Sequence, residues 1–426
     1  MYEYVGADHW KRITVFNLAY WKNGLVFKNF NFSSSGRPVI KIAELKSGIT
    51  DQTKFTDGKY DQNVLVQEGD MLFSWSGNPD TSIDIFRWEG AEGWLNQHIF
   101  KVTPSHGVDE DFLFFLLRWL RPRFAEIASN KQTTGLGHVT LQDFKTMSVG
   151  LPDLLEQKAI VSFVKPLQDK INLNRRTNET LEALAQALFK DWFVDFGPTR
   201  AKAEGRPPYL APEIWGLFPD ALDEEDKPAG WEYKSLDEVA SFLNGLASQK
   251  YPPEADDFLP VIKIVELRNG IAEKTRKASP NIPPQYVVKD GDVLFSWSGS
   301  LIHLIWTGGH GALNQHLFKV TSERFPKWFY YFWIGHHIPT FQAIASSKAT
   351  TMGHIQRHHL TEALAVIPHK LTLKATDAVL SPMFNRIIAN DLESRTLTQL
   401  RDLLLPKLMS GEIRLHDAEK AVEVVL

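Results

Sequence analysis

VIKIAELKSGI at residues 39–49 returns as VIKIVELRNGI at residues 261–271, with eight of eleven positions identical. Two further segments repeat in the same order: GDMLFSWSG at 69–77 with GDVLFSWSG at 291–299, and LNQHIFKVT at 95–103 with LNQHLFKVT at 313–321. The separation between the members of each pair is nearly constant along the chain. Self-similarity at a long, nearly constant offset is typical of a duplicated architecture. The sequence therefore predicts two copies of one structural unit.

Composition limits what these units can be. The 426 residues are 43% hydrophobic and 23% charged, which is ordinary for a soluble globular protein. The absence of cysteine excludes disulfides, a thiol nucleophile, Cys-ligated zinc and iron–sulfur clusters. With no signal-peptide pattern and no apolar run long enough to span a membrane, we expect a cytoplasmic protein without a membrane anchor. At a net charge of −4, nucleic-acid binding would need a local basic surface or partner subunits.

Each copy is predicted to contain a globular part and then a helical part. Short β-branched and aromatic runs bounded by Gly, Asn, Asp and Pro predict strands, with one helical stretch at residues 112–129, so each globular part is expected to be a mixed α+β domain. The connector between the copies is rich in Pro, Gly and acidic residues. The expected boundaries are globular domains at 1–150 and 231–367, helical regions at 151–197 and 368–411, the connector at 198–230 and a C-terminal tail at 412–426.

An apolar seam with gaps alternating between four and three residues runs through both helical regions. It extends from Ile160 to Trp192 in the first copy and, with the same gaps, from Thr376 to Leu408 in the second. Each residue of the first seam thus has a counterpart in the second, and we call this correspondence the helix repeat. Asn174 and Asn390 interrupt the seam at the same place, and an Asn in such a seam usually fixes register and partner. The pattern predicts that the two helices pair as an antiparallel coiled coil in a pseudo-twofold molecule. The alternative is two core helices of ordinary domains.

Prolines and glycines set the expected limits of these helices. Pro166 and Pro382 occupy equivalent positions, where each is expected to open its helix or to kink it. Gly197-Pro198 and Gly411 are plausible stops. A helix from Pro166 to Phe193 would be about 42 Å long at 1.5 Å per residue. This length predicts a spacer.

Over nearly its whole length, the chain resembles the specificity subunit of type I restriction-modification enzymes. The resemblance rests on the duplicated domain with FSWSG and LNQHxFKV, on LPDLLEQKAIVSFV at 151–164, and on ALFKDWFVDFGPTRAKAEG at 187–205. It implies an α+β fold of two tandem target recognition domains, each followed by a long helix. It also implies that each domain reads one half of a bipartite, asymmetric double-stranded DNA target. The helices would space the domains and bind two modification (methyltransferase) subunits, and restriction/translocase subunits would complete the complex.

The duplication separates shared from copy-specific residues. Residues identical in both copies cannot distinguish two half-sites, so they are expected to be framework or phosphate contacts. Phe73, Trp75, Phe295 and Trp297 are expected in the core, and the Asn-Gln-His triads at 96–98 and 314–316 as hydrogen-bonded framework. Candidates for DNA-backbone contacts, with a plain solvated loop as the alternative, are Lys131, Thr133, Thr134, His138, Lys348, Thr350, Thr351 and His354.

Copy-specific stretches are the candidates for base readout. They are residues 51–67 against 273–289, and 78–94 against 300–312. Both hold side chains that read base edges, although most surface cations are simply solvated. The candidates are Gln52, Lys54, Lys59, Gln62, Asn63, Arg87, Lys274, Arg276, Lys277, Asn281, Gln285 and His303.

Catalytic patterns are missing from the sequence. There is no GxxxxGK[ST] loop, and the nearest approach to a methyltransferase Asn/Asp-Pro-Pro-aromatic turn is Arg206-Pro207-Pro208-Tyr209. Asp220, Glu225 and Lys227 are interpreted as a solvated connector, and His336, His337, His358 and His359 match no zinc spacing. We therefore predict a non-catalytic chain without a metal or cofactor of its own. The resemblance places S-adenosylmethionine, ATP and Mg on partner subunits.

Phe189, Trp192 and Phe193 at the helix exit are expected to form a subunit-docking surface. The alternative is that they close the intramolecular helix pair. Two other functions remain open. A single-chain restriction enzyme would need catalytic domains in this sequence, and a protein-interaction scaffold would show no sequence-specific DNA effect.

Overall fold

The computed structural model describes residues 6–132, 135–253, 257–347 and 353–418. Its contacts divide the chain into two compact units. The first unit comprises residues 1–170 and 397–426, and the second comprises residues 171–396. Each unit therefore holds one globular domain together with segments of both long helices.

The first unit contains two four-stranded sheets. The antiparallel sheet has the order β2-β10-β6-β8, and the second sheet has the order β4-β3-β9-β5 with β3 and β9 parallel. Met71 and Phe73 of β6 face one apolar cluster while Leu72 faces another, so the whole strand is buried because both of its faces are covered. The bounds are β2 Ala19–Asn23, β3 Arg37–Ile40, β4 Phe55–Thr56, β5 Leu65–Val66, β6 Met71–Ser74, β8 Asp84–Arg87, β9 Gly93–Leu95 and β10 Ile99–Pro104.

The second unit repeats this topology. Its sheets have the orders β14-β21-β18-β19 and β16-β15-β20-β17, again with one parallel pair, β15 with β20. Phe295 of β18 faces one cluster and Leu294 the other, as in the first unit. The bounds are β14 Ser241–Asn244, β15 Leu259–Ile262, β16 Lys277–Ala278, β17 Val287–Val288, β18 Val293–Ser296, β19 His303–Ile305, β20 Gly311–Leu313 and β21 Leu317–Thr321.

Helices and short strands complete each domain. The expected helix at 112–129 is present as α3 Glu110–Trp119 and α4 Arg121–Asn130, and its counterpart is α11 Lys327–Ser347. The first domain closes by pairing β1 Lys11–Thr14 with β12 Ser148–Leu151, and the second by pairing β13 Glu232–Ser235 with β22 Leu364–Ile367. The remaining short elements are α1 Ile42–Ser47, β7 Ser76–Gly77, α2 Pro79–Ser82, β11 Gly137–His138, α5 Leu141–Thr146, α8 Pro212–Trp215, α9 Leu236–Val239, α10 Ile264–Asn269 and α12 Arg357–Glu362.

The two long helices are α6 Leu154–Phe189 and α13 Lys370–Ser410. Both continue through their prolines, so the expected opening at Pro166 and Pro382 is wrong. Helix α6 begins earlier because Asp153 caps it, with its carboxylate accepting the backbone N–H of Glu156 at 2.9 Å. Both prolines are exposed, so water can reach the carbonyl that each leaves without an N–H partner. At 36 residues, α6 spans about 54 Å.

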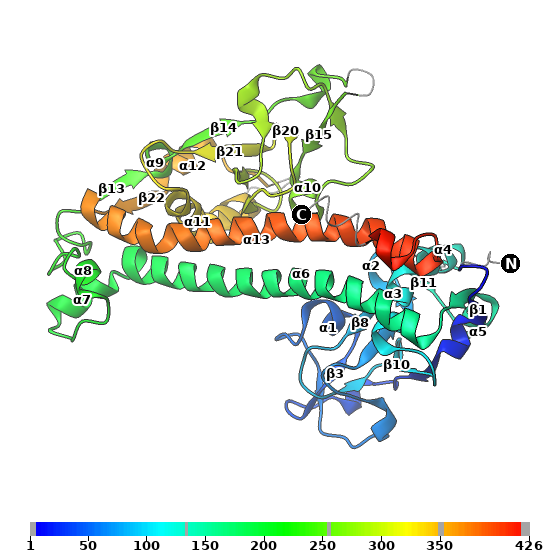
Figure 1. Cartoon of the computed structure of the whole chain (residues 1–426). Helices are drawn as coiled ribbons and strands as arrows, with labels where there is room; N and C mark the ends of the chain where they lie inside the picture. The colour runs from blue at the N-terminus through cyan, green and yellow to red at the C-terminus, as the bar shows by residue number, and fades with distance from the viewer. Residues whose placement is uncertain (1–5, 133–134, 254–256, 348–352, 419–426) are drawn as a thin grey trace. The chain divides into compact units, whose positions relative to one another are not determined.

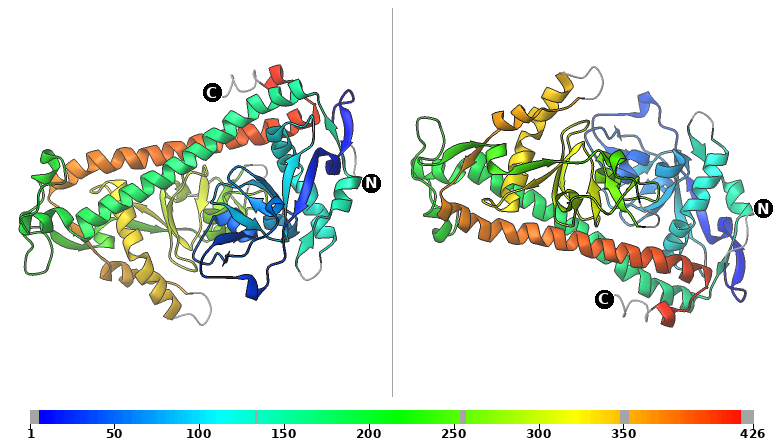
Figure 2. Two further views of the ribbon diagram at one scale, coloured as in Figure 1. Left: turned by 90° about the horizontal axis from the view of Figure 1, so that it is seen from below. Right: turned by 90° about the horizontal axis from the view of Figure 1, so that it is seen from above.

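Polar layers in the seam show that the helices pair antiparallel, as predicted. Asn390 Nδ2 donates to Asn178 Oδ1 at 2.8 Å, and Asn174 Nδ2 donates to Ser394 Oγ at 3.2 Å. Arg401 donates to Gln168 Oε1 at 2.6 Å. Residue numbers thus fall along α13 as they rise along α6, and Figures 1 and 2 show the pair side by side. The first two contacts are equivalent, because Asn174 is the counterpart of Asn390 in the helix repeat and Asn178 is the counterpart of Ser394. The centre of the helix pair therefore has pseudo-twofold symmetry.

The helix exits differ by one residue. A π-helical turn, η4 Lys190–Val194, follows α6, and the left-handed Phe196 (φ 56°) then precedes α7 Gly197–Ala203. In α13 the left-handed residue is Gly411 (φ 71°), directly after Ser410, which agrees with the predicted stop. Phe196 comes four positions after the seam residue Trp192, whereas Gly411 comes three positions after the equivalent Leu408. The π turn accommodates the additional residue, as single-turn π segments do.

Candidate nucleic-acid interface

Shared residues build the same small cluster in each domain. The half-buried Trp75 donates its indole N–H to Asn23 Oδ1 at 3.0 Å, and Trp297 donates to Asn244 Oδ1 at 2.9 Å. Phe73 and Phe295 are fully buried in the core as expected, whereas Trp75 and Trp297 are half-buried and pack against the core clusters. Sequence reasoning could not show that these indoles stay partly exposed, since a Trp at the end of a core strand has the same apolar neighbours as a buried one.

The Asn-Gln-His triads are framework at their first position. Asn96 is buried and its backbone N–H donates to Ile40 O at 3.0 Å, and the equivalent Asn314 donates to Ile262 O at 3.1 Å. His98 lies half-buried against the Trp75 ring, with centroids 5.4 Å apart, and burial lowers its pKa. His316 packs on Trp297 in the same way at 5.5 Å. The histidines are therefore placed at the edge of the exposed Trp clusters.

The shared loop returns to these clusters. His138 is exposed and pairs with Ser76 across β11 and β7, and the exposed His354 forms the equivalent bridge with Ser298. Lys131 is anchored by an ion pair with Asp143, whose pKa is lowered by this bond although burial opposes its ionisation. The predicted backbone candidates that lie outside the described residues are Thr133, Thr134, Lys348, Thr350 and Thr351.

In each unit, the copy-specific loop follows a short helix whose start is capped by a buried glutamate. Glu44 accepts the backbone N–H of Lys41 at 3.0 Å and the hydroxyl of Thr53 at 3.0 Å. Glu266 accepts the N–H of Lys263 at 3.1 Å. Thr53 and Thr275 are buried although they lie inside the divergent stretches. Each of the two different loops thus follows a helix capped by a buried glutamate and holds a buried Thr at the same position, which sequence comparison of the copies could have revealed.

Most predicted reading residues on these loops are exposed. Lys277 Nζ lies 3.8 Å from the centroid of the Phe258 ring. Asn63 is held by Asp61, whose pKa is lowered by the Asn63 backbone N–H and by the Lys22 ammonium group. The residues with exposed side chains are Gln52, Lys54, Lys59, Gln62, Asn63, Lys274, Arg276, Lys277, Asn281 and Gln285. Among the described residues, no ion pair engages Lys54, Lys59, Lys274 or Arg276.

Two predicted reading residues are instead engaged within their own domains. Arg87 bonds Glu110 at 2.8 Å and Asp111 at 2.6 Å. His303 packs on Tyr331 with ring centroids 4.6 Å apart, and burial lowers its pKa to about 4. Both belong to β-strands that face α3 or α11. These contacts make them weaker candidates for base readout than the cations on the loops.

The aromatic residues at the helix exit do not form an exposed surface. Phe189, Trp192 and Phe193 are all buried, and Phe193 stacks on Trp231 with centroids 5.9 Å apart. The expectation of exposed aromatic rings is therefore wrong, and these residues close the intramolecular core of the second unit. The buried Asn174 and Asn390, by contrast, take part in helix pairing as predicted.

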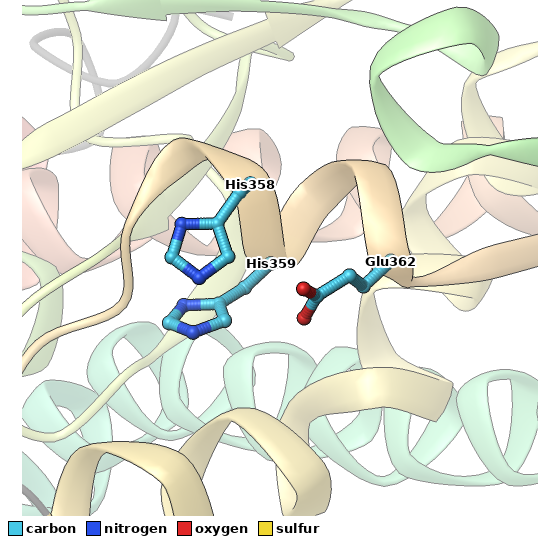
Figure 3. A group of neighbouring side chains, drawn as sticks. All are labelled: His358, His359 and Glu362. Carbon is cyan, nitrogen blue, oxygen red and sulfur yellow. The ribbon is translucent and has the colours of Figure 1, made fainter.

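His358, His359 and Glu362 on α12 form the one group of potential metal ligands found among the described residues. Figure 3 shows the two imidazoles one above the other and Glu362 one turn further along. His359 Nδ1 accepts the backbone N–H of Gln356 at 2.9 Å, which requires the proton on Nε2. Metal ligation through Nε2 would reverse this tautomer and break the helix cap. The residues therefore do not fit a metal centre.

The connector offers no assembled catalytic group among its described residues. Lys227 is bound by Asp223 and Glu225, whose hydrogen bonds raise its pKa to about 12. Asp220 pairs instead with Lys202. Tyr209 of the Arg-Pro-Pro-Tyr segment donates to Asp191 at 2.9 Å. Within the described ranges, every helix is too short or too polar to cross a bilayer.

Comparison with known proteins agrees with this architecture. The family model described as the type I restriction modification DNA specificity domain matches residues 8–183 and 228–389. The HindI specificity subunit of Haemophilus influenzae is 25% identical over 402 residues, covering 82% of this chain and 87% of that protein. The MjaIX specificity subunit of Methanocaldococcus jannaschii is 25% identical over 337 residues, covering 76% and 73%. The crystal structure of a type I restriction-modification S subunit from M. genitalium covers 95% of this chain and 97% of its own, with a TM-score of 0.56 and 13% identity, and supports the fold.

Proposed function

The chain belongs to the type I restriction-modification DNA specificity family, and from this premise we propose that each of its units reads one half of a bipartite, asymmetric DNA target. Its relatives are specificity subunits, so the chain is a non-catalytic recognition subunit, with methylation and cleavage carried out by other subunits. The observation that carries the proposal is the duplicated scaffold with different loops. Glu44 and Glu266 are both buried and accept the same backbone N–H at the start of the helix before each loop, while the exposed Lys, Arg, Gln and Asn side chains of the loops differ. Different readers on one scaffold suit two different half-sites.

The shared clusters suit contacts that are common to both half-sites. The half-buried Trp75 and exposed His138 of the first unit recur in the second as the half-buried Trp297 and exposed His354. Side chains that do not differ between the readers can position DNA through its phosphates without specifying sequence. We assign DNA-backbone contacts to these clusters and base readout to the cationic loops.

The helix pair supplies the spacing between half-sites. Both α6 and α13 include residues of the two units. Half-sites on one face of B-DNA repeat about every 34 Å, and a helix of about 54 Å can bridge such a separation.

Two modification subunits would dock on the long helices. Leu155 in the first turn of α6 is 81% exposed, and Leu371 in the first turn of α13 is 68% exposed. They occupy the same position of the helix repeat. Exposed leucines kept at equivalent positions are favourable anchors for two copies of one partner. These residues replace the buried helix-exit aromatics as the proposed docking points.

Cofactors are assigned to the partners. S-adenosylmethionine would be bound by the modification subunits, and ATP and Mg by the restriction/translocase subunits. The chain carries a net charge of −4, so we expect weak DNA binding alone and tight binding once partners enclose the duplex.

Co-expression with a modification subunit, followed by genome-wide mapping of N6-methyladenine, tests the proposal. A bipartite motif should appear only when this chain is present. Replacing residues 51–94 by the corresponding segment of the second unit should change one half-site alone. As a matched control, Lys158→Ala on the exposed face of α6 should leave the motif intact. A co-purifying subunit without any motif would contradict sequence reading and favour a scaffold function.

A further inference from the structure

The loop between β2 and β3, residues 24–36, holds an aromatic ring out into solvent. Its middle forms the 3₁₀ turn η2 Asn29–Asn31, in which Asn31 Oδ1 accepts the backbone N–H of Lys28 at 2.8 Å. The side chain of Phe30, at the centre of this turn, is 80% exposed. A phenyl ring this exposed gains hydrophobic free energy only when another molecule covers it.

Contacts on both sides of the turn fix its position next to the copy-specific loop. Before the turn, the ring of Phe27 packs edge-on against Tyr60, with centroids 5.2 Å apart. After the turn, the backbone N–H of Ser33 donates to Phe55 O at 2.9 Å. Tyr60 and Phe55 both belong to the copy-specific loop that carries the predicted reading residues of the first unit. Phe30 is therefore presented beside those residues by a braced turn.

The segment around this turn is basic, although the chain as a whole is acidic. Between His9 and Ala43 there is no Asp or Glu, and the cationic residues are Lys11, Arg12, Lys22, Lys28, Arg37 and Lys41. Two of these six form exposed ion pairs, which are weak and can be exchanged for phosphates. The corresponding segment of the second unit, residues 230–265, has three Lys and six Asp or Glu. The charge around Phe30 thus complements a duplex, which is a polyanion.

The second unit offers no comparable ring among its described residues. Its equivalent loop, residues 245–258, runs from β14 to β15. The most exposed apolar ring in the described part of this loop belongs to Phe258, at 38%, and Lys277 Nζ already lies 3.8 Å from its centroid. The exposed ring on a basic turn is therefore a property of the first unit.

We propose that Phe30 inserts into the first half-site as an apolar wedge, where it stacks on the base pairs of one step and kinks the duplex. Proteins that insert such side chains partly unstack a base step, and the bent duplex then contacts more of the protein surface. Because pyrimidine–purine steps unstack easily, the wedge favours such a step at a position that no hydrogen bond reads. This inference rests on the proposed function and deepens it, since the first half-site is then read partly through its deformability.

The test uses the full chain assembled with its modification subunits on duplexes that carry the mapped target. A nick placed in turn at each step of the first half-site keeps every base and lowers the cost of unstacking that step. The wild-type complex should bind one of the nicked duplexes about tenfold more tightly than the intact duplex. The Phe30→Ala complex should bind these two duplexes equally, and Phe30→Trp, which keeps a ring, should retain the gain.

Phe258→Ala in the second unit is the matched control and should leave the gain in place. Energy transfer between dyes at the two ends of the duplex should report a bend with the wild-type complex and a smaller bend with Phe30→Ala. Because Phe30 is so exposed, its replacement should not unfold the domain. Equal gains in the wild-type and Phe30→Ala complexes, or no gain at any step with the wild type, would overturn the inference.

Two further outcomes separate this inference from its alternatives. Loss of a modification subunit from the Phe30→Ala complex, with the gain from the nick unchanged, would overturn the inference and show that the ring binds protein. A wild-type complex that does not distinguish the mapped target from a scrambled duplex would contradict the proposed function itself.

Discussion

At the residue scale, equivalent positions in the two units report what each side chain contributes. His303 pairs with Phe295 across β18 and β19, as Ile85 pairs with Phe73 across β6 and β8. A histidine therefore stands where the first unit has an apolar core residue. Burial keeps it neutral, because it lowers the pKa of His303 from 6.5 to about 4.

Stability should therefore depend on pH through His303. The unfolded chain binds a proton near pH 6.5 while the folded chain resists it, so stability falls as the pH drops from 6.5 towards 4. We expect His303→Ile to stabilise the chain at pH 5 by roughly 1–2 kcal/mol more than at pH 8. Urea unfolding of both proteins at the two pH values measures this difference. An equal effect at pH 5 and pH 8 would argue against a neutral buried imidazole.

The buried glutamates should control reading in one unit at a time. Glu44→Ala removes the acceptor for Lys41 N–H and the Thr53 hydroxyl and leaves these groups without a partner. We expect a local cost of about 1–3 kcal/mol and loss of specificity at the first half-site only. Glu266→Ala is the matched control and should affect the second half-site only. Methylation mapping of both variants distinguishes loop support from a general loss of folding, which would abolish both half-sites.

The sequence predicted the roles of some residues and not of others, because some contacts depend on the fold. The shared and divergent classes correctly separated framework Asn96 from exposed Lys54. Sequence could not show that Arg87 is held by Glu110 and Asp111, because those partners come from a helix further along the chain. Nor could it show that Trp75 stays partly exposed, since that depends on how segments distant in the sequence pack around it.

At the element scale, the seam predicted the helix pair and its partners. Apolar residues spaced alternately by four and three positions, with Asn at matching places, predict a facing helix that offers matching polar groups. Asn174, Asn178 and Asn390 form hydrogen bonds with such groups. The start of α6 was mispredicted because a capping Asp153 and an exposed proline outweigh the usual position of Pro in the first turn. The π turn was also missed, since an inserted residue leaves no mark in composition.

Asn390→Leu should destabilise the helix pair. It removes the amide that donates to Asn178 Oδ1 and leaves this buried oxygen without a donor, at a cost of about 1–3 kcal/mol. Replacing Asn174, Asn178 and Asn390 together by Leu should destabilise the pair further, because Ser394 Oγ and Asp391 Oδ1 then also lose their amide donors. Chemical unfolding of the single and triple variants provides the comparison. A triple variant as stable as the wild-type chain would contradict a structural role for these amides.

Docking should depend on the first turn of each long helix. Leu155→Asp and Leu371→Asp introduce a charge at an exposed apolar anchor, and each should remove one modification subunit, with the double variant removing both. Leu403→Asp, on another exposed leucine near the end of α13, serves as the control. Size-exclusion chromatography with light scattering gives the stoichiometry. Full assembly of the double variant would exclude these anchors.

At the scale of the whole molecule, the net negative charge indicates that this chain recognises the DNA sequence while its partners supply much of the binding affinity. The chain is acidic overall, yet Lys54 and Lys59 extend from the first unit without ion pairs among the described residues. In the assembled complex, Lys54→Ala should reduce the slope of log K against log salt by about 0.9 if it contacts a phosphate. If Lys54 instead reads a base, the slope should stay unchanged, while the difference in binding free energy between the correct base and a mismatched base at one position should fall by about 1–3 kcal/mol. Fluorescence anisotropy with matched and mismatched duplexes decides between these roles, and no change in either quantity would remove Lys54 from the interface.

The nearly identical segments on either side of the two reading loops also bear on how such a chain can change over generations. Each loop is bounded by segments that are nearly the same in both units, VIKI with its buried glutamate before it and LFSWSG after it. A crossover in the coding DNA within these segments would exchange the loop together with its two short strands, β4 and β5 or β16 and β17, and leave the other strands, the helix seam and the exposed leucines in place. A lineage can therefore acquire a new half-site specificity in one recombination event. Because the two half-sites can change independently, the number of possible targets is the product of the number of specificities available to each unit.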